Sequence, residues 1–266
     1  MLEKSAAGYA FLQRKVKEHV GIDLAMYKDR QMMRRLTGYL QRHNLPSFYA
    51  LGRLIERDPD ALRALREFLT INVTEFFRNP ASFETLKSRV LPELARVGEP
   101  LRIWSAGTAN GAEAYSLAIL LEELRLGPEH RIMATDIDQG ALDEARTGIY
   151  GPMHLKEVSD ARRRLFFEAV GEETWRIRPG VAARVAFRRH DLLRDPYPSP
   201  THLILCRNVV IYFTEEAKER IYLGFARSLV PGGYLLVGGT ESILRPARFG
   251  LESAGPFLYR RTEVAV

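Results

Sequence analysis

Apolar residues recur at helical spacing through the first 70 residues of the chain. In YKDRQMMRRLTGYLQRHNL, residues 27–45, Met33, Leu36 and Leu40 follow one another at intervals of three and four, which predicts one buried helical stripe. The segments 47–58 and 60–71 fit two further helices. Because no alternating strand pattern precedes Leu101, the sequence predicts a small all-helical domain at the start of the chain.

The pattern changes after residue 100, where short apolar runs alternate with helical segments. Helices are predicted within 114–127, 140–148 and 214–229, and the apolar runs are LRIWSAG, RIMATDID, ARVAFRRHDLL, THLILCRNVVIYF and YLLVGG. Strand and helix in this rhythm favour a parallel sheet that is covered on both faces. Such sheets bind ligands beyond the carboxyl ends of their strands, so the polar residues at those ends are the candidate site.

The first strand leads into SAGTANGAEAYS, residues 105–116, where Gly107 and Gly111 allow a tight loop before a helix. This loop has neither the G-x-G-x-x-G spacing of dinucleotide sites nor the lysine of a phosphate-binding loop. A ligand without phosphates is therefore expected. Glu113, just inside the helix, either meets a cationic or hydroxyl-bearing ligand or interacts only with the helix dipole.

Polar side chains also follow the next strands. Asp136 in TDID is placed to accept hydrogen bonds from the paired hydroxyls of a ribose, and its neighbour Asp138 is an alternative that instead caps the following helix. Asp191 in HDLL is expected near an adenine edge. The run CRNVVIYF places three more residues at the mouth of the same site: Arg207, Asn208 and Tyr212.

The segment TINVTEFFRNP, residues 70–80, fits neither a clean amphipathic helix nor a clean strand. It sets Asn72, Thr74 and Arg78 beside two adjacent aromatic residues, Phe76 and Phe77. Two interpretations follow from these residues. The segment is either a loop with two core aromatics or a stretch that turns its polar groups toward a ligand.

Composition narrows the class of protein, with 46% hydrophobic and 27% charged residues, as in globular proteins. The formal net charge of +6 is consistent with an acidic partner and equally with a solvated basic surface. The single cysteine, Cys206, excludes an internal disulfide, and the six histidines lack ligand spacing, so no metal site is expected. Early charges argue against a signal peptide, and no apolar run approaches the roughly 20 residues of a membrane span. A cytoplasmic protein is expected.

Five sequence blocks, in order, resemble the CheR family of chemotaxis receptor methyltransferases. They are TINVTEFFRNPASF, IWSAGTANGAEAYSLAILL, ATDIDQGALDEARTGIY, LILCRNVVIYF, and LVGGTESI with FLYRR. The resemblance covers nearly the whole chain. It implies S-adenosylmethionine-dependent O-methylation of receptor glutamates, with S-adenosylhomocysteine as the product, by a cytoplasmic enzyme that is recruited to membrane receptor arrays.

The resemblance also implies an α/β architecture in three parts. Residues 1–70 are expected to form a helical receptor-docking domain, and 71–90 a linker that contributes to the cofactor site. Residues 91–266 are expected to form a class I, Rossmann-like methyltransferase domain. An insertion at about 152–190 is expected to form a small β-subdomain.

Residue roles are implied position by position. Cofactor contacts are expected from Asn72, Thr74, Arg78, Gly107, Glu113, Asp136, Asp191, Leu192, Arg207 and Asn208. Arg78 is also the candidate for holding the acidic substrate, and Tyr212 is a weaker candidate for lining the substrate channel. Arginines that fall largely off the apolar stripe are expected to dock on the acidic methylation helices of a receptor, with a solvated face as the alternative: Arg30, Arg34, Arg35 and Arg42.

Three departures from the family pattern concern the cofactor site. They are GTANGAE in the first loop, Asp191 in place of a common Asn, and Gly239 in place of a His. They bear on cofactor affinity more than on reaction type. Two alternative functions are a nucleic-acid methyltransferase, whose Asn/Asp-Pro-Pro-Tyr signature is lacking here, and a non-catalytic regulator that binds the cofactor.

Some relatives bind a receptor C-terminal pentapeptide on an edge strand of the β-subdomain. TWRIR, residues 174–178, has the alternation of such an edge strand. The preceding connection FEAVGEETW is short, however, and contains one glycine. The sequence therefore predicts that this protein does not depend on a pentapeptide tether.

Overall fold

The computed structural model describes residues 6–70, 72 and 74–262, and the contacts divide the chain into two units. One unit comprises Met1–Ile71 and Val210–Arg220, and the other comprises Asn72–Val209 and Ile221–Val266. No helix in the described ranges is long and apolar enough to cross a membrane.

The first unit is built from helices. Its elements are α1 (Ala6–Lys15), η1 (Val16–Val20), η2 (Leu24–Met26), α2 (Asp29–Arg42), α3 (Phe48–Arg57) and α4 (Pro59–Leu69). Ser47 caps α3 by accepting a hydrogen bond from the Ala50 N–H, and Asp58 caps α4 in the same way. The predicted all-helical region is confirmed.

Helix α2 buries Met32, Leu36, Tyr39 and Leu40, whereas Met33 is only half-buried. The predicted stripe is therefore wrong at Met33. Tyr39 turns inward, where its ring lies 4.8 Å from that of Phe68 in α4. This inward aromatic ring shifts the buried face of the helix toward Met32.

The segment Val210–Arg220 pairs with residues next to α2. It contains η5 (Val210–Tyr212) and the first turns of α11 (Glu215–Ser228). The Lys28 N–H donates to the Tyr212 carbonyl and the Thr214 N–H to the Met26 carbonyl, both at 2.9 Å. This segment falls inside the range 91–266 expected of the methyltransferase domain, yet it clusters with the helices, and nothing in its local sequence indicates that pairing.

The second unit contains a seven-stranded sheet in the order β6-β2-β1-β7-β8-β10-β9. Its strands are β1 (Arg102–Ala106), β2 (Arg131–Asp136), β6 (Val185–Arg189), β7 (Thr201–Cys206), β8 (Leu229–Val237), β9 (Leu251–Gly255) and β10 (Leu258–Arg261). The first five strands in the sheet order are parallel, and β10 pairs antiparallel with β8 and β9. The predicted, mostly parallel sheet is confirmed.

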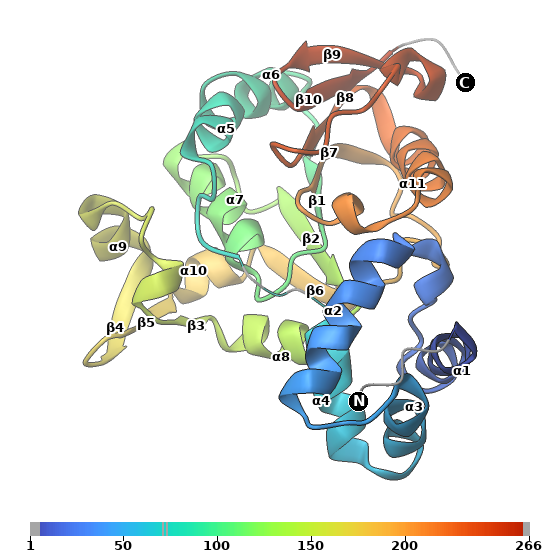
Figure 1. Ribbon diagram of the computed structural model, residues 1–266. Helices are drawn as coiled ribbons and strands as arrows, with labels where there is room; N and C mark the ends of the chain where they lie inside the picture. The colour runs from blue at the N-terminus through green and yellow to red at the C-terminus, as the bar shows by residue number, and fades with distance from the viewer. Residues whose placement is uncertain (1–5, 71, 73, 263–266) are drawn as a thin grey trace. The chain divides into compact units, whose positions relative to one another are not determined.

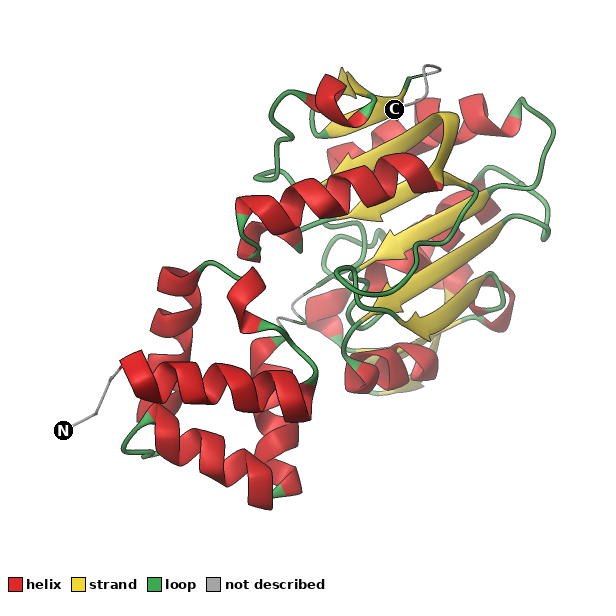
Figure 2. Ribbon diagram, turned by 90° about the vertical axis from the view of Figure 1, so that its right-hand side faces the viewer, coloured by secondary structure: helices red, strands yellow, loops and turns green. Residues whose placement is uncertain are grey.

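Helices cover both faces of this sheet. They are α5 (Pro80–Thr85), η3 (Leu86–Val90), α6 (Leu91–Ala95), α7 (Ala112–Glu123), α8 (Gln139–Thr147), the end of α11 and η6 (Pro246–Phe249). Figure 1 shows α5 and α7 on one side of the strands and α11 on the other, and Figure 2 shows helices in front of and behind the sheet. Successive strand residues alternate between these layers. Ile103 joins the cluster that contains α7, while the Trp104 ring lies 5.4 Å from that of Phe225 in α11.

A smaller sheet with the order β3-β5-β4 lies beside α9 in Figure 1. Its region contains β3 (Ile149–Tyr150), η4 (Pro152–His154), α9 (Asp160–Phe166), β4 (Phe167–Gly171), β5 (Thr174–Ile177) and α10 (Pro179–Ala182). The predicted β-subdomain is thus present, but the range 152–190 is too long at its end, because β6 pairs with β2 in the main sheet.

The expectation that TWRIR forms an edge strand is wrong. Its first four residues form β5, the central strand, which pairs with β3 on one side and β4 on the other. The reason is the tight connection after Gly171, which returns the chain directly alongside β4. In the described part of this sheet, the two edge strands are β3 and β4.

Candidate functional site

The strand order reverses beside β1, which lies between β2 and β7. In parallel sheets ligands bind at the carboxyl ends of the strands beside such a reversal. The loop after β1 turns at Gly107, where φ is +79° and an added Cβ would lie 2.4 Å from Val209. The N–H groups of Gly107 and Thr108 donate to the Thr135 carbonyl at 2.8 and 2.9 Å. A glycine is required at position 107, because the backbone has a positive φ and there is no room for a Cβ atom. The two hydrogen bonds hold the loop close to β2.

Asp136, the last residue of β2, faces this loop. Its Oδ2 accepts a hydrogen bond from the Ala109 N–H at 2.8 Å, and its Oδ1 accepts one from the Asp138 N–H at 3.0 Å. Burial raises the pKa of Asp136, and these backbone hydrogen bonds oppose the shift. Because a carboxylate oxygen accepts more than one hydrogen bond, the group is both fixed in position and able to bind ligand hydroxyls.

Asp138 is the N-cap of α8, because its Oδ1 accepts a hydrogen bond from the Gly140 N–H at 2.9 Å. The alternative interpretation of this residue is therefore confirmed. Its other oxygen, Oδ2, accepts a hydrogen bond from Asn72 Nδ2 at 2.8 Å. That bond ties the start of the predicted linker to the carboxyl end of β2.

Glu113 lies in the first turn of α7 and is only 8% exposed. Its Oε1 accepts a hydrogen bond from Ser105 Oγ at 2.8 Å, and its Oε2 lies 3.5 Å from Arg207 Nη1. Burial raises the pKa of Glu113, and the charge of Arg207 opposes the shift. Glu113 therefore interacts with specific side chains, Ser105 and Arg207, in addition to the dipole of α7.

The aromatic part of the linker packs into the second unit. The Phe76 ring lies edge-on to those of Tyr150 and Phe167, with centroids 4.8 and 5.1 Å apart. The Phe77 N–H donates to Ser116 Oγ at 2.9 Å. Both phenylalanines are almost completely buried, so they fix the path of the polar residues around them.

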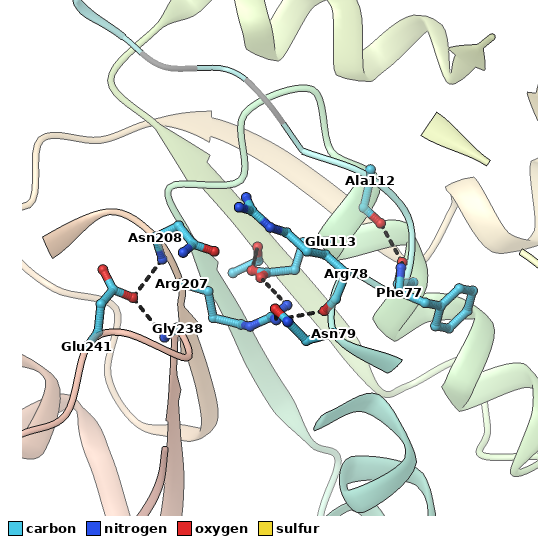
Figure 3. A network of polar contacts seen from close by, with 11 residues as sticks. Phe77, Arg78, Asn79, Ala112, Glu113, Arg207, Asn208, Gly238 and Glu241 are labelled. Atoms are coloured by element: carbon cyan, nitrogen blue, oxygen red, sulfur yellow. Dashed lines mark hydrogen bonds and ion pairs between the residues drawn. The ribbon is translucent and has the colours of Figure 1, made fainter. Parts of the chain in front are cut away.

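We call residues Phe76–Asn79 the strap. Arg207 Nη2 donates to the Arg78 carbonyl at 2.6 Å and to Asn79 Oδ1 at 2.8 Å. In Figure 3 the Arg207 guanidinium lies between Glu113 and the strap, while the Arg78 side chain points away from it. The side chains of Glu113 and Arg207 therefore meet the backbone of Arg78 at one place.

Glu241 is a site residue that the sequence did not single out. Its Oε2 accepts hydrogen bonds from the N–H groups of Asn208 and Gly238, at 2.6 and 2.7 Å (Figure 3). It joins the carboxyl ends of β7 and β8 and holds Asn208 at a φ of +60°. The block LVGGTESI contains this residue, but no spacing marks a glutamate as an acceptor for two backbone amides.

Asp191 lies two residues beyond β6. Its Oδ1 accepts a hydrogen bond from the Leu193 N–H at 2.8 Å, and its Oδ2 lies 3.6 Å from Arg194 Nε. The carboxylate therefore shapes its own turn. Cofactor contacts by Asp191 and its neighbour Leu192 stay a prediction, as do those of all the other residues predicted to contact the cofactor: Asn72, Thr74, Arg78, Gly107, Glu113, Asp136, Arg207 and Asn208.

The four arginines predicted to dock on a receptor differ in their surroundings. Arg30, Arg34 and Arg42 are exposed, whereas Arg35 is half-buried. Arg35 Nη2 donates to the Phe68 carbonyl at 2.5 Å, and its guanidinium lies 5.9 Å from the Tyr212 ring centroid. Burial lowers the pKa of Arg35. This residue joins the end of α4 to Tyr212 within the helical unit, and the substrate role of Tyr212 stays a prediction.

The groups at the carboxyl edge of the main sheet fit a nucleoside joined to an amino acid. Asp136 suits ribose hydroxyls, and Glu113 suits an ammonium group. Thr108 Oγ1 and Arg207 Nε, which belong to the loops after β1 and β7, are among the buried side-chain atoms that have no hydrogen-bond partner in the described part of the chain, and buried polar groups normally have one. S-Adenosylmethionine carries a ribose, an ammonium and a carboxylate, so these residues fit it.

Family comparisons cover both units. The model described as "CheR methyltransferase, SAM binding domain" matches residues 72–255, and "CheR methyltransferase, all-alpha domain" matches residues 7–70. A chemotaxis protein methyltransferase of Listeria monocytogenes is 40% identical over 96% of this chain and 97% of its own length. Chemotaxis protein methyltransferase 1 of Pseudomonas aeruginosa is 36% identical, over 84% of this chain and 85% of its own. The Vibrio cholerae protein of the same name is 35% identical, over 86% and 87%.

Proposed function

Because the chain belongs to the CheR methyltransferase family, whose methyl donor is S-adenosylmethionine, we propose that it methylates glutamate side chains of chemotaxis receptors. The products are glutamate methyl esters and S-adenosylhomocysteine. The printed names of the relatives, chemotaxis protein methyltransferases, support a receptor as the substrate. No observation favours nucleic acid or a purely regulatory role.

The observation that carries the proposal for glutamate is the placement of Arg78. The site presents two buried or partly buried acids, Glu113 and Asp136, and these would repel a substrate carboxylate unless a cation faced it. Arg207 directs its Nη groups to the strap and to Glu113. Arg78 is the half-buried cation of the strap, and a guanidinium binds a carboxylate through strong, charge-assisted hydrogen bonds.

The chemistry requires positioning more than proton transfer. The bound cofactor supplies an electrophilic methyl group on its sulfonium. A glutamate carboxylate has an unperturbed pKa of about 4.3 and is ionised at neutral pH, so no residue has to act as a general base. In-line alignment can contribute on the order of 7–11 kcal/mol to such a reaction. Arg78 orients the substrate carboxylate, and the packed strap excludes water.

The remaining polar residues would hold the cofactor. Asp136 binds the ribose hydroxyls, and Glu113 binds the ammonium of the methionine part. Asp191 and Leu192 flank the adenine, and Asn208 approaches from the end of β7. Asn72 and Thr74 contribute from the linker.

We propose that the receptor docks on the exposed face of α2. Arg30 and Arg34 are exposed on this helix and would meet the acidic methylation helices of the receptor. Arg42 is exposed at its end, where its guanidinium lies 5.0 Å from the Phe68 ring centroid. Arg35 contributes indirectly, because its hydrogen bonds to the end of α4 fix the helix that carries the others.

A methyl-transfer assay with tritiated S-adenosylmethionine tests the proposal. Receptor-containing membranes should become labelled, and mild alkali should release the label as volatile methanol, because esters hydrolyse where N-methyl groups do not. Membranes that lack the receptor serve as the control. Label transferred to RNA, alkali-stable label on the receptor, or binding of cofactor without transfer would each contradict the proposal.

A further inference from the structure

The backbone of the strap has an uncommon conformation on both sides of Arg78. Phe77 has a φ of +54° and Asn79 a φ of +60°, in the left-handed region that residues other than glycine seldom adopt. For a bulky residue such as phenylalanine this conformation is costly, and it persists only where the surroundings hold it. The contacts of the strap therefore show what determines the direction of Arg78.

One holding contact comes from α9. The Arg162 guanidinium lies 3.9 Å from the Phe77 ring centroid, and its Nε and Nη2 donate to the two carboxylate oxygens of Glu123, at 2.7 and 2.9 Å. A guanidinium oriented by a bidentate pair covers the face of an aromatic ring well. This contact fixes the residue that precedes Arg78.

The second holding contact comes from Arg207, which is 7% exposed. Its Nη2 reaches the carbonyl of Arg78 and the side chain of Asn79, and its Nη1 faces Glu113. The backbone oxygen of Arg78 and the residue that follows it are thus bound to one cation. That cation comes from the end of β7, a rigid part of the main sheet.

We propose that Arg207 is a positioning residue, which fixes the direction of the Arg78 side chain by holding the strap to Glu113. This inference rests on the proposed function in one respect only, that Arg78 binds the substrate. Arg207 acts through the Arg78 carbonyl and Asn79 Oδ1. Its Nη2 donates to the strap and its Nη1 faces Glu113, so both ends of the guanidinium fork are engaged within the protein.

Asn79→Gly tests the proposal with little disturbance of the backbone. Glycine adopts a positive φ readily, so the substitution keeps the conformation and removes the Oδ1 that accepts from Arg207. Asn44→Gly is the matched control, because Asn44 also has a positive φ, +53°, and lies in the helical unit. Arg207→Lys is the complementary variant, since one ammonium cannot reproduce the fork that reaches Asn79, the Arg78 carbonyl and Glu113.

Two measurements give the readout. Loss of a hydrogen bond to a charged group corresponds to about a tenfold effect or more, so Asn79→Gly should lower kcat for receptor methylation about tenfold. Its calorimetric affinity for S-adenosylhomocysteine should stay within about twofold of wild type. Hydrogen exchange of the Phe77 amide in the cofactor-free protein should become about tenfold faster, because that amide reports the order of the strap. Asn44→Gly should change none of these values.

Three outcomes would overturn the proposal. They are unchanged exchange at Phe77 in both Asn79→Gly and Arg207→Lys, wild-type kcat in both variants, and a fall in cofactor affinity that matches the fall in kcat. The last result would make Arg207 a cofactor ligand alone. The hydrogen-exchange measurement needs no substrate. If the wild-type protein failed to methylate receptors, the proposed function would be contradicted, but exchange at the Phe77 amide would still test whether Arg207 holds the strap.

Discussion

At the scale of single residues, the candidate site is held mainly by carboxylates that accept hydrogen bonds from backbone amides. Asp136 accepts from two N–H groups of its own loop region, and Glu241 accepts from two others. The position of Asp136 was predictable, because the end of a strand is marked by the change from apolar to polar residues. The direction of the Arg207 side chain was not predictable, because the Arg78 carbonyl to which it donates lies 129 positions away along the chain.

Asp136→Ala should weaken the binding of S-adenosylhomocysteine by about 1.5–3 kcal/mol, because it removes a charged acceptor for the ribose hydroxyls. Isothermal calorimetry measures this affinity. Asp143→Ala is the control, since Asp143 is an exposed acid on α8 that pairs with Arg146. An affinity of the Asp136 variant equal to that of the control would contradict the ribose assignment.

The affinity for S-adenosylhomocysteine should also depend on pH through Asp136. Burial raises the pKa of this carboxyl in the ligand-free protein, and ligand hydroxyls donate to its ionised form. Affinity is therefore full above the ligand-free pKa and is lost as pH falls through it. Glu113, whose pKa burial also raises, adds a loss of the same sign.

Calorimetric titration of wild type and of Asp136→Asn with S-adenosylhomocysteine at a series of decreasing pH values separates the contributions of Asp136 and Glu113 to the pH dependence. The variant should bind more weakly at neutral pH and lose less affinity on acidification, because only the contribution of Glu113 remains. Parallel pH profiles for the two proteins would show that Asp136 does not bind the ligand in its ionised form.

At the scale of elements, the strap connects packing to the site. Phe76 is completely buried between the rings of Tyr150 and Phe167. Phe76→Ala should lower the free energy of unfolding of the second unit by about 3–5 kcal/mol, because it leaves a cavity that the rings cannot close. Urea unfolding followed by circular dichroism measures the change.

Leu244→Ala is the matched control for that experiment, because Leu244 is an apolar residue that is 80% exposed. Its unfolding free energy should stay within about 0.5 kcal/mol of wild type. A loss of less than about 1 kcal/mol in Phe76→Ala would mean that the phenylalanine does not anchor the strap.

Helix α2 shows what periodicity can and cannot predict. The helix itself followed from the spacing of apolar residues, but the choice between Met32 and Met33 depended on a contact between Tyr39 and Phe68, which lies outside the helix. The same limit applies to Arg35. A helical wheel places it with the polar residues, and only the end of α4 explains why its guanidinium is half-buried.

The charge of the exposed face of α2 should control the rate of receptor methylation. Reversing both Arg30 and Arg34 to Glu should slow methylation at low salt and flatten its dependence on salt, because steering between exposed charges fades over about 10 Å at 0.1 M ionic strength. Initial rates across a salt series measure this effect.

Arg35→Glu provides the contrast. It should lower the thermal stability of the helical unit, since it removes the donor to the Phe68 and Leu69 carbonyls. The double variant at Arg30 and Arg34 should keep the wild-type melting temperature. Wild-type methylation by the double variant at low salt would exclude docking through this face.

At the scale of the whole molecule, the order of the main sheet follows from a sequence in which apolar runs alternate with helices. The grouping of Val210–Arg220 with the helical unit does not follow from the sequence in this way. Its backbone pairs with Met26 and Lys28, nearly two hundred positions earlier, and local patterns cannot report such pairings. The small sheet gives the same lesson, because alternation in TWRIR predicted a strand but not which of its edges was already paired.

The whole protein should reach its receptor without a pentapeptide tether. The β5 strand is paired on both sides, and the connection from β4 is a tight turn. Titration of the enzyme with a receptor C-terminal pentapeptide should give no binding below about 100 μM, which corresponds to about −5.5 kcal/mol. Low-micromolar binding would assign the open edge of β4 to receptor anchoring.

Peptide mapping by mass spectrometry of a receptor incubated with the enzyme and S-adenosylmethionine tests the central claim most directly. The predicted result is the added mass of a single methyl group on glutamate side chains of the acidic methylation helices. The modification should disappear after mild alkali and should be absent when those glutamates are replaced by alanine. Methyl groups found on lysine or arginine nitrogens, or a receptor that stays unmodified while another macromolecule is methylated, would contradict the account.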